Sequence, residues 1–211
     1  RRHILTVITL FCAVLFIGLI PVHAEMPKGQ IIMSIEKSTL GQGYLMEPQY
    51  VDFYEGDNMA DVTLRQLRKL GRRYNYTGGT NHGFYLAEIS DRGRGAINIP
   101  DYIKNMITKS NLKLYSDGTP EYLGEFDYTR QSGWMYCYNG IYPVVSACEI
   151  TPRNGDVLQW QFTLVGLGTD LKGNQEYFQK NNKTVLNRVE ISRLLAKIKK
   201  KPELLKNTEV K

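Results

Sequence analysis

The first half of the chain alternates between short apolar runs and loops. Residues 30–36 form an apolar, β-rich run that predicts a strand, and residues 44–54 read as a second extended segment with Pro48 favouring a sheet edge. A helix is predicted over residues 59–70, because Val62, Leu64, Leu67 and Leu70 lie near helical spacing. Asp57 or Asn58 is placed to cap its first turn, and Gly71 to end it. Together these elements predict two strands followed by one helix.

The following residues are again dominated by short strands. Residues 74–77 and 83–89 predict two strands around a glycine-rich loop that contains His82, and residues 101–108 predict a short helix after Pro100. Residues 122–128 read as extended. Residues 133–138 and 141–145 flank Asn139-Gly140, a pair that favours a type I′ turn because both central positions need positive φ. A β-hairpin is therefore predicted there.

The last strand has the clearest alternation in the chain. Over residues 157–164, one face carries Leu158, Trp160, Phe162 and Leu164, and the other carries Val157, Gln159, Gln161 and Thr163. Residues 172–183 are polar and predict a loop. Apolar residues at helical spacing then predict a helix over 186–198, which Pro202 ends or kinks; they are Leu186, Val189, Leu194, Leu195 and Ile198. The expected fold class is α+β, with a mostly antiparallel sheet, one early helix and a C-terminal amphipathic helix.

The first 24 residues have the pattern of a secretory signal peptide. Arg1, Arg2 and His3 precede an apolar run over residues 4–20, and small residues stand at positions −3 and −1 before Glu25. The run is short for a membrane span, so an uncleaved anchor is the alternative. The prediction is a protein that is exported and is either secreted or held at the cell surface.

Charge is distributed unevenly along the chain. Residues 183–211 hold nine basic and three acidic residues, whereas residues 25–182 hold 16 basic and 18 acidic residues. A net charge of −2 over this main body argues against a nucleic-acid-binding domain. The basic tail, residues 172–211, is expected to be either a solvated helix or a contact for an anionic envelope polymer or lipid surface.

Few residues in the chain are suited to catalysis or metal binding. After the predicted cleavage only His82 remains as a histidine, and there is no zinc spacing and no nucleophile motif. Cys137 and Cys148 remain as cysteines, and an exported location permits a disulfide between them without demanding one. The prediction is a protein that is not an enzyme and has no resident metal.

Two motifs carry a resemblance to a known family. The run GWMYCYNG at residues 133–140, followed by NGDVLQW at residues 154–160, resembles the domain of unknown function related to the C-terminal domain of transcobalamin and intrinsic factor. The likeness spans roughly residues 30–171, so a domain is expected over residues 25–171. It implies a small β-grasp-like domain of the kind found on secreted and surface proteins of Gram-positive bacteria. In the vitamin carriers that domain covers one face of cobalamin, while a helical domain covers the other.

The predicted site is the hairpin at residues 133–142. Strand alternation puts Trp134, Tyr136 and Tyr138 on one face and Met135 and Cys137 on the other. With the sulfur-bearing face in the core, the aromatic face is expected to bind a flat ligand, and the alternative is that Trp134 packs on a neighbouring strand. The complete predicted ligand-binding set is Trp134, Tyr136, Tyr138, Tyr142, Gln159, Gln161, Tyr85 and His82.

The expected function is therefore a secreted ligand-binding module. Cobalamin or another corrinoid is the possible ligand, His82 is either a ligand to cobalt or a solvated turn residue, and a second protein would have to supply the other wall of the site. The rival function is a structural or protein-interaction domain of the cell envelope, in which the aromatic face docks a protein and the basic tail contacts anionic polymer.

Overall fold

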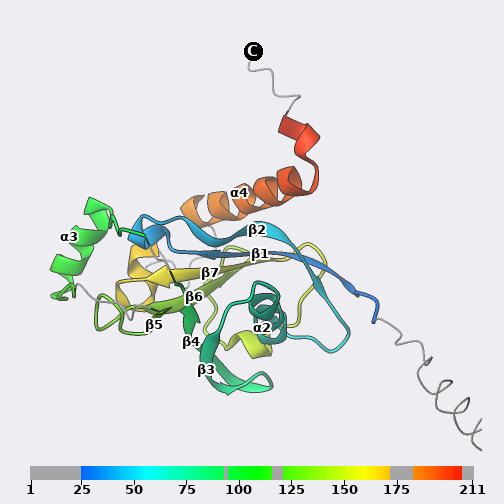
Figure 1. Ribbon diagram of the computed structural model, residues 1–211, viewed down its shortest axis with the longest axis horizontal. Helices are drawn as coiled ribbons and strands as arrows, with labels where there is room; N and C mark the ends of the chain where they lie inside the picture. The colour runs from blue at the N-terminus through cyan, green and yellow to red at the C-terminus, as the bar shows by residue number, and fades with distance from the viewer. Residues whose placement is uncertain (1–24, 93–94, 116–120, 172–182, 206–211) are drawn as a thin grey trace, which may run out of the picture.

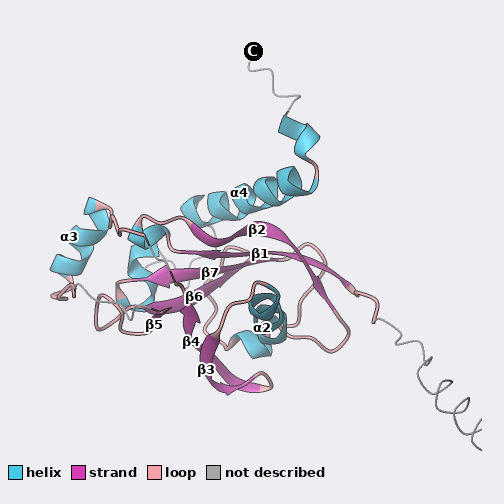
Figure 2. Cartoon of the chain, in the orientation of Figure 1, coloured by secondary structure: helices cyan, strands magenta, loops and turns pink. Residues whose placement is uncertain are grey.

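A computed structural model describes residues 25–92, 95–115, 121–171 and 183–205. The predicted signal peptide and most of the polar segment after Leu171 lie outside these residues. Figure 1 shows two sheets with a helix on each side of the larger one, and Figure 2 shows the same view by secondary structure. Within the described part of the chain, no helix has both the length and the apolar character that crossing a bilayer requires.

The larger sheet has the strand order β2-β1-β7-β6. It is built from β1 (Gly29–Glu36), β2 (Tyr44–Phe53), β6 (Gly133–Tyr138) and β7 (Val157–Thr163). β1 pairs antiparallel with β2 and parallel with β7, and β7 pairs antiparallel with β6. An edge hairpin, a helix across one face and a parallel final strand beside β1 make this a β-grasp-like arrangement, so the expected α+β fold class is confirmed.

The smaller sheet has the order β3-β4-β5. Its strands are β3 (Tyr74–Gly79), β4 (His82–Ser90) and β5 (Tyr122–Gly124), and the short helix α3 (Asp101–Lys109) lies between β4 and β5 in the chain. A buried ion pair connects the two sheets: Lys37, which follows β1, places its Nζ 2.8 Å from Asp91 Oδ2, directly after β4. Further 3-10 turns are η1 (Ser38–Leu40), η2 (Ala147–Glu149), η3 (Gly166–Leu171) and η4 (Pro202–Leu205).

The helix α2 (Met59–Lys69) closes the main core against the larger sheet. Asn58 caps it, because its side chain accepts from the Asp61 amide and Asp61 accepts from the Asn58 amide in return. Its apolar stripe packs on the inner residues of β1 and β7, and the Trp160 indole donates to Thr63 Oγ1 at 3.0 Å. The apolar row predicted for residues 157–164 is thus the core face of β7.

The helix α4 (Lys183–Lys200) lies on the opposite face of the same sheet. It buries Val189, Ser192 and Ala196, not the leucines that define the predicted apolar face. The expected helix is confirmed, and of the apolar residues at helical spacing Val189 is buried, whereas the three leucines are exposed. The cause is the polar character of this side of the sheet: Gln159 donates to Ser192 at 3.0 Å, so a narrow, small-residue face fits best.

Two strand predictions differ from the structure. The Asn139-Gly140 turn has positive φ at both residues, as predicted, but only Ile141 bridges back to Tyr138 and residues 142–145 form no strand. Pro143 cannot donate to a ladder, and β6 pairs with β7 instead. The extended segment expected over residues 122–128 ends at Gly124, because Phe126 and Tyr128 adopt left-handed backbone.

Candidate functional site

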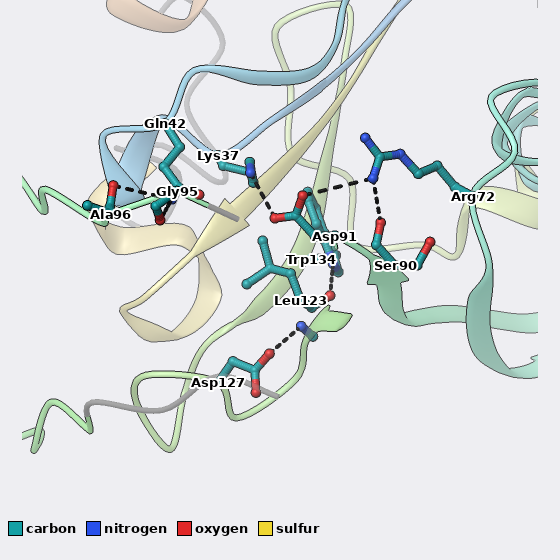
Figure 3. Close-up of polar contacts among 11 residues, drawn as sticks. Lys37, Gln42, Arg72, Ser90, Asp91, Gly95, Ala96, Leu123, Asp127 and Trp134 are labelled. Atoms are coloured by element: carbon teal, nitrogen blue, oxygen red, sulfur yellow. Dashed lines mark hydrogen bonds and ion pairs between the residues drawn. The ribbon is translucent and has the colours of Figure 1, made fainter. Parts of the chain in front are cut away.

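The strand β6 is covered on both faces. Its alternation is as predicted, but Trp134 is only 4% exposed and packs edge-on against Phe162, with ring centroids 5.3 Å apart. The indole donates to the Leu123 carbonyl at 2.8 Å, as Figure 3 shows. The expectation that the aromatic row faces outward is therefore wrong, and the alternative, in which Trp134 packs on a neighbouring strand, holds. The reason is that β6 joins the sheet through β7, which turns the aromatic row into the main core.

The other aromatic residues of the predicted hairpin are held by the protein itself. The Tyr136 hydroxyl donates to the Val145 carbonyl at 2.5 Å, and the Tyr138 hydroxyl donates to Asp156 at 2.9 Å. Tyr142 is buried, and its hydroxyl donates to Gln161 Oε1 at 2.5 Å. Burial first, and Asp156 second, raise the pKa of Tyr138 to about 12. All three hydroxyls are thus engaged by the protein itself, with Tyr142 buried and Tyr136 and Tyr138 half-buried.

The two glutamines lie beneath α4 and η3. Gln159 is buried against Ser192, and Gln161 is fully buried between Tyr142 and Glu36, to which its amide donates. Neither amide can reach a ligand on the aromatic side, because the two sets of side chains lie on opposite faces of the sheet. His82 is exposed at the turn between β3 and β4.

The possible disulfide between Cys137 and Cys148 is absent, since both are free cysteines. Cys137 belongs to the small cluster with Tyr142 and Leu171 on the α4 side of the sheet, whereas Cys148 packs on the main core. The sheet itself separates the two sulfur atoms. Burial raises the pKa of Cys137 to about 12, so this thiol is also a poor nucleophile.

Trp134 and Tyr85 are the two predicted residues that share a hollow, which we call the aromatic hollow. Its volume of about 420 Å³ lies inside the usual range for ligand sites. Trp134, Met135 and Gly133 of β6 contribute to its lining, together with Tyr85 of β4. The remaining lining residues come from the end of β7 and from the two loops that follow β5 and β7: Glu125, Phe126, Gln131, Ser132, Thr163, Gly166 and Leu167.

Two bulky apolar residues in the lining of this hollow are exposed and have left-handed backbone. Phe126 is 61% exposed with φ 67°, and Leu167 is 66% exposed with φ 57°. For a residue with a Cβ, this conformation costs about 1–2 kcal/mol. Such outliers cluster at functional sites, where the surrounding structure holds the strain. Neither side chain gains enough burial to explain its strained placement.

Hydrogen bonds fix the loop that carries Phe126. Its amide donates to the Ser132 carbonyl at 3.1 Å, and the Glu125 amide donates to the Ala87 carbonyl at 3.0 Å. Asp127 accepts from the Gly124 amide at 2.8 Å, a contact drawn in Figure 3. These bonds tie both sides of the strained residue to the rest of the fold.

The turn that carries Leu167 is fixed in a similar way. Gln131 Oε1 accepts from the Gly166 amide at 3.1 Å, and a Cβ on Gly166 would meet that same oxygen at 2.8 Å. A Cβ on Gly168 would meet Met135 Sδ at 2.9 Å. Close packing of the two glycines therefore sets the path of the turn, and Leu167 projects from between them.

Formal charge at the aromatic hollow is limited to one carboxylate. Among the described residues that line the hollow, Glu125 is the one acidic residue, and none is a lysine, arginine or histidine. The Glu125 carboxylate interacts with the Tyr85 hydroxyl. Burial, followed by the Glu125 charge, raises the pKa of Tyr85, so this phenol stays protonated. Among the described residues, no group of three or more His, Cys, Asp or Glu side chains could hold a metal ion. The hollow can thus offer apolar contact, aromatic faces and one negative charge.

The sequence pattern indicates Trp134 and Tyr85 but gives no sign of Phe126, Leu167 and Glu125. Nothing in the residue types of 124–128 signals positive φ, since phenylalanine and tyrosine rarely adopt it. The glycines around Leu167 are the one available signal, and they indicate a turn without showing where its side chain projects.

Comparisons with known proteins do not assign the chain. No family model matches it, and a search of the curated proteins finds no significant match. The resemblance to the transcobalamin-related family stays a prediction.

Proposed function

We propose that this protein is an exported, non-enzymatic binding module whose ligand enters the aromatic hollow. The observation that carries the proposal is the strained, exposed placement of Phe126 and Leu167 beside a hollow that Trp134 and Tyr85 also line. Exposed aromatic and aliphatic side chains held rigidly around a concavity supply contact area at low entropic cost. Binding explains why the fold tolerates two costly backbone conformations in one place.

The lining favours a flat ligand whose part inside the hollow is uncharged or positively charged. Apolar contact with Phe126 and Leu167 would supply most of the free energy, and Glu125 disfavours an anionic group. A corrinoid remains the ligand that the family resemblance suggests. A hollow of about 420 Å³ is near the small end of ligand pockets, so it would cover only an edge of a corrin ring. Tight corrinoid binding would then need a partner protein as the second wall.

The test is an isothermal titration of the full chain with cyanocobalamin and, separately, with benzyltrimethylammonium, a small aromatic cation. We expect measurable binding of at least one of them, with a visible shift of the corrin absorption band if cobalamin binds. Phe126→Gly should weaken binding about tenfold or more, as loss of an aromatic anchor does. Tyr102→Ala, at an exposed position on α3, is the matched control and should bind as the parent does.

Two outcomes would count against the proposal. If neither compound produces heat at high micromolar concentration, the hollow is not a site for this class of ligand. If binding occurs but is equal in Phe126→Gly and the parent, the ligand lies elsewhere on the protein. If the cation binds and cobalamin does not, the proposal of a binding module stands and a corrinoid is rejected as its ligand.

A further inference from the structure

The outward side of α4 presents an apolar stripe to solvent. Ile191, Leu194, Leu195 and Ile198 stand at i, i+3, i+4 and i+7; the first three are exposed, with Leu194 at 57%, and Ile198 is half-buried. We call these four residues the α4 stripe. In η4, Leu204 and Leu205 are also exposed. Singly exposed apolar residues are ordinary, but a continuous row of them marks an interaction surface.

The inward side of α4 already satisfies the helix's contact with the sheet. Val189 and Ala196 pack on Ile32 and Val157, and Ser192 pairs with Gln159. Ile191 and Leu194, the most exposed members of the stripe, therefore play little part in attaching α4 to the fold, and their exposure calls for an external partner.

Charge on the same segment identifies the chemistry of that partner. Residues 183–205 hold seven basic and two acidic residues. Lys197 and Lys199 lie in the last turn of the helix that carries the stripe, and Lys201 follows it, whereas Lys200 Nζ lies over the Tyr50 ring on the sheet side. Pairing two copies through this surface would bring two strongly positive segments together, which disfavours self-association. Leucines beside lysines match an anionic bilayer, where apolar side chains enter the acyl boundary and ammonium groups meet the headgroups.

A hollow beside the stripe adds to this match. It has a volume of about 480 Å³, lies between α4 and the edge strand β2, and is lined mainly by apolar residues, which are Tyr44, Pro48, Leu195, Ile198 and Pro202. Lys199 and Glu47 complete its lining, with Lys199 Nζ 3.5 Å from Glu47 Oε2. An acyl segment could occupy this hollow while Lys199 stays close to a lipid phosphate.

We propose that the α4 stripe and its lysines lie on an anionic lipid surface. The inference does not depend on the aromatic hollow, because it uses only α4, η4 and the edge of β2. The helix would lie in the plane of the interface and would not cross it, which agrees with its short apolar stripe.

The test places a tryptophan reporter on the stripe in the full chain. Leu194→Trp is mixed with vesicles of phosphatidylglycerol and brominated phosphatidylcholine, and quenching of its fluorescence reports entry into the acyl boundary. Tyr102→Trp, exposed on α3, is the matched control. The buried Trp134 and Trp160 are common to both variants, so they contribute the same background. Both variants also carry the apolar run at residues 4–20, so binding through that run would not distinguish them.

We expect quenching of Leu194→Trp at least twofold greater than that of Tyr102→Trp. Replacing Lys197, Lys199 and Lys201 by glutamine should weaken vesicle affinity about tenfold or more, since each ammonium group gains favourable interaction near an anionic surface. High salt should weaken the affinity in the same way, because salt screens these charges.

Three outcomes would overturn the proposal. The first is equal quenching of the two reporters, and the second is undiminished quenching with phosphatidylcholine alone. The third is a change in the fluorescence of Leu194→Trp with protein concentration in the absence of lipid, which would show that a second copy of the chain covers the stripe.

Discussion

Replacing Phe126 by glycine and by alanine tests whether its backbone is strained. Both variants lose the same ring, which is 61% exposed, so the loss of apolar burial is nearly the same in the two. They differ in the backbone, because φ is 67° and only glycine adopts that region without a steric penalty. The difference in stability between the two variants thus separates strain from packing.

The expected difference follows from the size of two opposing effects. Relief of a left-handed conformation gives glycine about 1–2 kcal/mol over alanine. The greater freedom of glycine in the unfolded chain costs it about 0.5–1 kcal/mol. From the midpoints of these two ranges we expect Phe126→Gly to be more stable than Phe126→Ala by about 0.8 kcal/mol. At an ordinary helical position the order is reversed, because glycine costs about 1 kcal/mol relative to alanine.

The assay is urea denaturation of the two variants, monitored by circular dichroism. Their free energies of unfolding are compared on condition that the m-values are equal. Tyr102→Gly and Tyr102→Ala, at an exposed position inside α3, form the control pair and should show the ordinary order. If Phe126→Gly is no more stable than Phe126→Ala, the backbone at this position is not strained. Strain would then give no support to ligand binding at the aromatic hollow.

Three further predictions concern the buried groups. Lys37→Met should lower the free energy of unfolding by about 1–3 kcal/mol, because it removes the nearer of the two cations beside the buried Asp91 carboxylate and leaves Arg72 Nη1 at 4.0 Å, and urea denaturation should show the double variant with Asp91→Leu recovering part of that loss. The second prediction uses a variant in which Cys12, the cysteine in the apolar run at residues 4–20, is replaced by serine. A thiol reagent at pH 8 should modify the partly exposed Cys148 first and should leave Cys137 unmodified until the protein unfolds, as peptide mass spectrometry can check. Early modification of Cys137 would contradict its burial. The free energy of unfolding should fall as the pH rises from about 9 to about 12, because the pKa of Cys137 is raised in the fold from 9.0 to about 12 and the unfolded chain releases that proton first; the fall should be smaller in Cys137→Ala.

The elements of the larger sheet could be predicted because each has a strong local pattern. Alternation over 157–164 and the Asn58 cap before α2 are readable from neighbouring residues alone. The parallel pairing of β1 with β7 was not predicted, because it joins strands that lie far apart in the chain. The pairing of β6 with β7, which sets Trp134 opposite Phe162, decides which face of β6 enters the core. The turn at Asn139-Gly140 is therefore predicted correctly, whereas the face of β6 that is exposed is predicted incorrectly.

The site was predictable in part for the same reason. Trp134 and Tyr85 were identified as aromatic residues on strands, but their shared hollow depends on two loops whose backbone conformations are unusual for their residue types. Strain of this kind comes from tertiary hydrogen bonds, such as that from the Phe126 amide to the Ser132 carbonyl, and leaves no trace in local propensity.

Strain and exposure together favour binding over a purely structural role for this region. A scaffold loop could replace Phe126 and Leu167 with glycine and lose little burial, since both side chains are largely in solvent. A bulky side chain at positive φ costs stability at each position. That cost is offset only if the exposed side chain gains contacts with another molecule. Contact with a ligand at the hollow that both residues line is the role that we propose for them.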